Sequence, residues 1–148
     1  MDELMTIYQK EFAVPRLALV RDIFIFASFT GLAFIDVQQL AAEHIVQDNN
    51  EHYWIRKTRQ KTNNMCNIPL LDIPLAILKK YDNHPTCIRR GVLLPVPCNQ
   101  NMNSYLKEIA DVCGIQKHLS THVASHSASS LSLRTNDLQN LNLRQVTI

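Results

Sequence analysis

The sequence predicts a mainly helical α+β domain with one small antiparallel sheet, and three observations support this prediction. Apolar residues make up 46% of the 148 residues, which is enough for a hydrophobic core. Most of the chain repeats its apolar residues at helical spacing, whereas one central stretch has short apolar runs broken by asparagine-rich turns. The sequence holds only three glycines, so few tight turns are expected.

Three helices are expected in the N-terminal part of the chain. Residues 2–12 form the first. The second begins at Pro15, which suits a first helical turn, and ends at Gly31, a natural C-terminal stop. Its second half is apolar on all sides, so this helix is expected at the centre of the domain. Asp36 is expected to cap the third helix, over residues 37–44.

The period changes over residues 44–71, where two or three short antiparallel strands are expected, with turns at 48–50 and at Asn63-Asn64. Residues 74–81 return to helical spacing behind Pro74. The proline-rich stretch 83–98 is expected to be a loop.

The C-terminal third is expected to contain two helices and a tail. Residues 99–113 are clearly amphipathic and end at Gly114, and a last helix is expected after a cap at Ser120 or Thr121. Beyond residue 133 the sequence becomes polar and weakly periodic. We therefore expect one domain over residues 1–133 and a divergent tail over 134–148 that is a candidate for disorder.

Composition excludes several classes of protein. The formal charge of +2 gives no argument for nucleic-acid binding, so any basic patch must be local. No two cysteines have a metal-ligand spacing, and the N-terminus lacks a secretion signal. No apolar stretch is long enough for a bilayer, so a cytosolic protein with reduced thiols is expected. The common phosphate-loop, nucleophile-elbow and zinc-protease signatures are absent.

A basic run, RKTRQKT, is the first candidate for function, with Arg56, Lys57, Arg59 and Lys61 as its cations. On a strand, Lys57, Arg59 and Lys61 alternate onto one face, and such a row suits contacts with phosphates. From spacing alone, a solvated edge strand kept soluble by its charge is the more common explanation.

Three histidines form the second candidate. His118, His122 and His126 have helical spacing, but a cap at Ser120 would leave His118 outside the helix. No carboxylate or cysteine lies within a turn to complete a ligand set, so no metal site is expected.

Several longer stretches, in order, resemble the catalytic domain of the tyrosine recombinases, and most of all the integrases of Bacteroidetes mobile elements. They are LVRDIFIFASFTGLAFIDVQQL, YWIRKTRQKTNNMCNIPLL, AILKKY, NQNMNSYLKEIADVCGI and LSTHVASH, within roughly residues 1–131. The resemblance implies a partial catalytic-domain fold, double-stranded DNA as partner, no cofactor and a bacterial cytoplasmic location. In this family a tyrosine attacks a DNA phosphate while arginines and a histidine or lysine stabilise the charge.

The family's site residues transfer only in part. Lys61 matches the hairpin lysine that protonates the leaving oxygen, His122 matches the histidine of the HxxR box, and Asp36 matches the acidic residue that supports the site. Ala33 and Ser125 stand where the family commonly has arginines.

The family's nucleophile has no counterpart, because all four tyrosines precede His122. The resemblance therefore implies a truncated and catalytically inactive recombinase fragment, and a frameshift near codon 125 would explain both Ser125 and the unusual tail. One alternative is a non-catalytic DNA-binding or oligomerising remnant that acts on intact recombinase protomers. A pseudogene product without function is the other.

Overall fold

The computed structural model describes residues 2–58 and 63–115. This part of the chain is mainly helical and has one three-stranded antiparallel sheet, which confirms the predicted fold class. The elements, in chain order, are α1 (Asp2–Gln9), α2 (Pro15–Thr30), α3 (Phe34–Gln39), the 3-10 helix η1 (Ala42–His44), β1 (Ile45–Gln47), β2 (Tyr53–Thr58), β3 (Met65–Pro69), α4 (Asp72–Lys80), α5 (Pro85–Arg90) and α6 (Asn99–Cys113).

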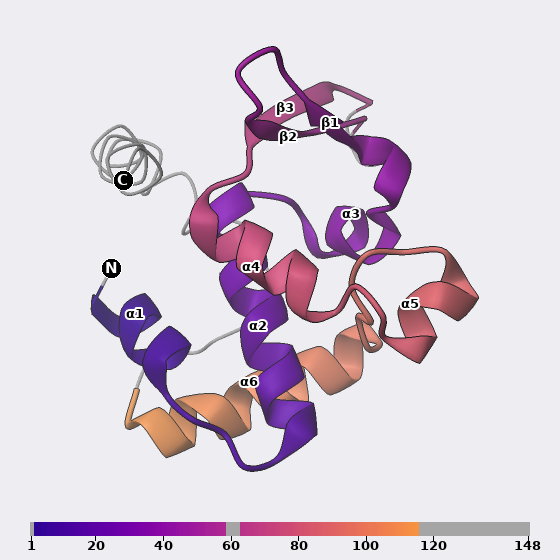
Figure 1. Ribbon diagram of the computed structural model, residues 1–148. Coiled ribbons are helices and arrows are strands. Elements are labelled where there is room, and N and C mark those ends of the chain that lie inside the picture. The colour runs from indigo at the N-terminus through magenta and orange to yellow at the C-terminus, as the bar shows by residue number, and fades with distance from the viewer. Residues whose placement is uncertain (1, 59–62, 116–148) are drawn as a thin grey trace.

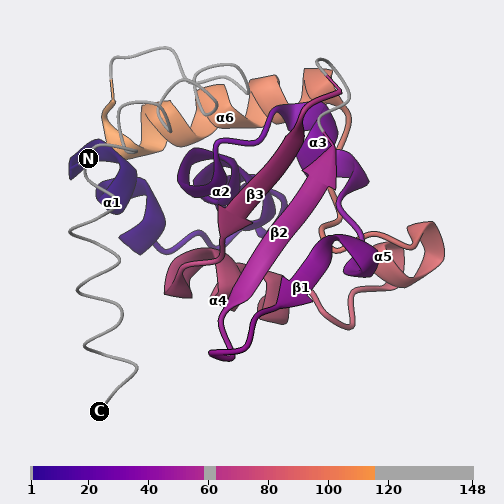
Figure 2. The same ribbon diagram turned by 90° about the horizontal axis from the view of Figure 1, so that it is seen from above.

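The sheet lies at one end of a helical body, and α6 crosses the other end (Figure 1). Seen from above, the sheet is nearest the viewer, with α2 and α4 behind it (Figure 2). The helices thus support one face of the sheet and present the hairpin of β2 and β3 at the end of the molecule.

α2 is the central helix, and it packs against α1, α4 and α6. Pro15 occupies its first turn, and Gly31 ends it with a positive φ of 74°, which a glycine adopts without strain. Both predicted boundaries are confirmed. Because three helices cover it, α2 buries side chains on all its sides: Leu17, Val20, Arg21, Asp22, Ile23, Phe24, Ile25, Phe26, Ala27, Ser28 and Thr30.

The sheet has the order β1-β2-β3, and both pairs are antiparallel. Asp48 fixes the predicted turn between β1 and β2, since its carboxylate accepts hydrogen bonds from the backbone N–H groups of Asn50 and His52, both at 2.9 Å. The indole of Trp54 donates to the other carboxylate oxygen at 2.8 Å and, more than any other contact, lowers the pKa of Asp48.

The prediction for Asp36 is wrong. α3 begins at Phe34, so Asp36 lies inside its first turn and does not cap a helix over 37–44. That predicted helix is also interrupted, because Leu40 is buried in an extended conformation and its carbonyl accepts a hydrogen bond from Leu93 N–H at 2.8 Å. A contact distant in sequence therefore ends the helix.

The loop expected over 83–98 contains a helix, α5. Pro85 occupies its first turn, where a missing N–H costs nothing, and the His84 side chain caps it by accepting from Thr86 N–H at 3.2 Å. Gly91 ends α5 in the left-handed conformation. One of the prolines that suggested a loop, Pro85, thus begins a helix.

The remaining helices match their predictions closely. α6 spans Asn99–Cys113 and ends at Gly114, as expected, while α1 ends at Gln9, before the predicted residue 12. α4 begins at Asp72, slightly before Pro74. The helix expected after Ser120 and the tail 134–148 lie outside the described residues.

Candidate functional site

The hairpin of β2 and β3 is the part of the structure that the basic run occupies. The two strands pair from Trp54↔Pro69 to Thr58↔Met65, so the predicted antiparallel hairpin is confirmed. Arg59 and Lys61 belong to the connection between these strands and lie outside the described residues, as do His122 and Ser125. Their predicted roles stay predictions.

Lys57 points into the molecule. On β2 it shares the inward face with Ile55; Ile55 is fully buried and Lys57 is only 7% exposed. Its ammonium lies 3.3 Å from Asp36 Oδ1 and donates to the carbonyl of Thr58 at 3.3 Å. The expectation of an exposed cation row that includes Lys57 is therefore corrected, because this charge is already paired inside the protein.

Asp36 approaches Lys57 from the first turn of α3 and is fully buried. A carboxylate in a helix's first turn is stabilised by the positive end of the helix dipole. Ala33, which the resemblance aligns with an arginine, immediately precedes this helix and is half-buried. The described part of the candidate site thus joins α3 to β2 through one buried ion pair.

Arg56 lies on the opposite face of β2 and is exposed. Its cross-strand neighbour on β3 is Asn67, which is also exposed. The outer face of the hairpin therefore presents a cation to solvent, as contact with a phosphate requires.

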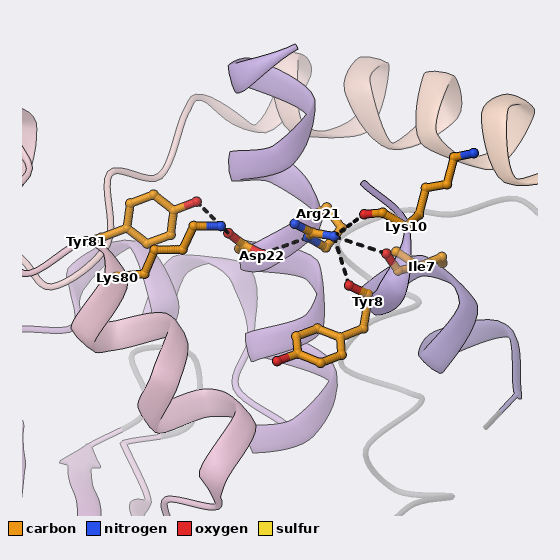
Figure 3. A network of polar contacts seen from close by, with 7 residues as sticks. All are labelled: Ile7, Tyr8, Lys10, Arg21, Asp22, Lys80 and Tyr81. Carbon is orange, nitrogen blue, oxygen red and sulfur yellow. Dashed lines mark hydrogen bonds and ion pairs between the residues drawn. The ribbon is translucent and has the colours of Figure 1, made fainter. Parts of the chain in front are cut away.

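Sequence reasoning missed a buried polar network around α2 (Figure 3). Asp22 accepts hydrogen bonds from Arg21 at 2.7 Å, from the Lys80 ammonium at 2.8 Å and from the Tyr81 hydroxyl at 2.5 Å. Charged residues in an otherwise apolar helix were the available signal. The network joins α2 to the C-terminal end of α4.

Arg21 extends this network to α1. Its guanidinium donates to the carbonyls of Ile7, Tyr8 and Lys10, at 3.3, 2.9 and 2.7 Å (Figure 3). Ile7 and Tyr8 belong to the last turn of α1, where carbonyls have no partner further along the helix, and Lys10 follows that turn. Arg21 thus closes the end of α1 and holds it on α2, so we assign the network to stability rather than chemistry.

Tyr81 gives this network a pH dependence. Burial, and then its hydrogen bond to Asp22, raise the pKa of Tyr81 above the ordinary value of 10.0. The stability that follows from the raised pKa is fully present well below pH 10. It is lost as the pH rises, because the unfolded chain then releases the tyrosine proton more readily than the folded protein does. Between pH 9 and 11 we expect the urea midpoint of the wild type to fall more steeply than that of Tyr81→Phe. Parallel slopes would contradict this.

Within residues 2–58 and 63–115 no group of histidine, cysteine, aspartate or glutamate side chains is arranged to bind a metal ion. In the same part of the chain, no helix is long and apolar enough to cross a membrane.

Comparison with known proteins gives matches among solved structures, whereas no protein-family model and no curated protein sequence matches. The chain is similar to XerH site-specific recombinase bound to its difH substrate in a pre-cleavage complex, with a TM-score of 0.66 and 16% identity. The post-cleavage complex of XerH with palindromic difH gives 0.67 and 16%, and XerA recombinase gives 0.59 and 15%.

Each match covers 90% of this chain, but only 40% of the XerH chain and 49% of the XerA chain. The chain therefore has a tyrosine recombinase-like fold, as the sequence resemblance implied, and spans less than half the length of these proteins.

Proposed function

We propose that this chain is a DNA-binding piece of a recombinase catalytic domain, and that it binds double-stranded DNA without cleaving it. The likeness to XerH, which was solved on a DNA substrate, supports the proposal. The single observation that carries it is the β2–β3 hairpin, which lies at one end of the molecule and includes the basic run (Figure 1).

Three cations of this run are proposed to meet phosphates. Arg56 is exposed on the outer face of β2, and the sequence puts Arg59 and Lys61 in the connection that follows. Lys57 is left out because Asp36 already pairs with it. Phosphate contacts of this kind fix a protein on the duplex without reading bases, so weak sequence preference is expected.

Replacement of Arg56 by glutamine removes one proposed phosphate contact, so it is expected both to weaken DNA binding and to reduce the salt dependence of the affinity. Each phosphate contact contributes about 0.9 to the slope of log affinity against log salt, so the slope should fall by roughly that amount. Fluorescence anisotropy on a labelled duplex between 50 and 200 mM salt, roughly the range in which such affinities change strongly, measures it.

Lys107→Gln is the matched control. Lys107 is also exposed, but it belongs to α6, at the end of the molecule away from the sheet (Figure 1). The Lys107→Gln variant should have the same slope of log affinity against log salt as the wild type. Equal losses for the two variants would indicate diffuse attraction to the whole protein, and a wild type that binds no duplex at low salt would refute the proposed function.

A further inference from the structure

The Asp36 carboxylate is the most deeply buried charge of the candidate site, with no exposed surface. An ionised carboxylate removed from water requires a nearby cation or several hydrogen-bond donors. The cation that the described structure provides is the ammonium of Lys57, which comes from β2 and is itself nearly buried. The negative charge of Asp36 on α3 is thus paired with the positive charge of a lysine on the sheet.

Position 33 is closer to Asp36 along the chain than Lys57 is, and a basic residue there would be another source of positive charge. The N–H of Asp36 donates to the carbonyl of Ala33 at 3.0 Å, so the two residues lie one turn apart. Ala33 is the N-cap residue of α3 and is extended, so a long side chain at position 33 would start one turn before Asp36. Ala33 is half-buried, which leaves such a side chain a path, but its methyl group carries no charge.

We propose that Lys57 is a positioning residue with two separable tasks: it supplies the counter-charge that position 33 lacks, and it ties the end of β2 to α3. Its hydrogen bond to the carbonyl of Thr58 extends this tie to the last residue of the strand. The connection with Arg59 and Lys61 begins at the next residue. An effect of this tie on DNA contacts made by that connection would rest on the proposed function, whereas both tasks can be measured without DNA.

The counter-charge is tested by removing the positive charge at position 57 and placing one at position 33. Lys57→Met keeps the length of the side chain and removes its charge, and we expect the Tm to fall by roughly 10 °C or more. Adding Ala33→Arg to this variant should recover at least half of the loss, while Ala33→Arg in the wild type should change the Tm little. Lys57→Arg should resemble the wild type. An unchanged Tm in Lys57→Met, or no recovery with Ala33→Arg, would overturn the inference.

The tie is tested by hydrogen exchange of backbone amides, compared between the β2–β3 hairpin and α6. In Lys57→Met, exchange should accelerate about tenfold or more in the hairpin relative to α6. The Ala33→Arg double variant should keep this fast exchange, because its new charge balances Asp36 without holding β2. Hairpin protection equal to that of the wild type in either variant would overturn the tie.

Two further measurements keep the test decisive. If Lys57→Met fails to fold, Lys57→Met with Asp36→Asn removes both charges and should fold, since loss of a whole pair costs far less than loss of one partner. Failure of this variant too would overturn the inference. Absence of DNA binding by the wild type would refute the proposed function alone, because Tm and exchange report the pair independently.

Discussion

Replacement of Asp22 by alanine is expected to lower the free energy of unfolding by about 3–5 kcal/mol, because it leaves a buried guanidinium without its carboxylate. The side chains of Arg21 and Asp22 are only 10% and 3% exposed, so solvent cannot compensate for the lost partner. The change also removes the acceptor of the Tyr81 hydroxyl. Small domains are stable by about 5–15 kcal/mol, so the variant is expected to be close to unfolding at room temperature.

Urea unfolding followed by circular dichroism measures this loss. Glu43→Ala is the matched control: it also removes a carboxylate, but one that is 80% exposed and 3.7 Å from His44, and its effect should stay within about 0.5 kcal/mol. A loss below about 1 kcal/mol for Asp22→Ala would show that Arg21 is satisfied by the α1 carbonyls alone.

The helices with local start and stop signals could be predicted from the sequence. Pro15 and Gly31 bound α2, and the apolar spacing with Gly114 defines α6, because these signals act within one or two turns. α3 could not be bounded in this way. Its end depends on Leu40, whose carbonyl pairs with a segment distant along the chain.

The direction of Lys57 was predictable in part. Alternation along β2 correctly separates Arg56 from Lys57, but alternation alone does not say which face is buried. Ile55 shares a face with Lys57, and an apolar residue at that position favours the inward direction. The charge run suggested the opposite, because a lysine is rarely buried unless it is paired, and the partner lies 21 residues away.

Incubation of this chain with DNA is expected to yield no covalent protein–DNA adduct. A covalent route needs a nucleophile at the phosphate, and none of the four tyrosines follows His122, where the family's resemblance would place it. The resemblance also implies that Ala33 and Ser125 stand where the family commonly has two guanidinium groups. The loss of one such charge costs on the order of 10³-fold in phosphoryl transfer.

The structure gives no substitute for the missing tyrosine in its described part. Tyr81 is buried and donates its hydroxyl to Asp22, and Tyr105 packs beneath the Arg16 guanidinium at 5.3 Å. Tyr53 begins β2, which puts it about 13 Å along the strand from Lys57 at about 3.3 Å per residue. Tyr8 belongs to α1, which packs against α2 and α6 rather than the sheet.

A nicked suicide duplex, which traps a cleaved intermediate, is the measurement, with an intact tyrosine recombinase and its own substrate as positive control. We expect no band that resists denaturant for this chain, even at protein concentrations that saturate DNA binding. A resistant band would contradict the prediction, and Tyr53→Phe would then be the first variant to examine, since Tyr53 shares the hairpin with the basic run. In the roles that the resemblance implies, Lys61 and His122 would not replace the missing step, because a general acid protonates a leaving oxygen only while a nucleophile displaces it.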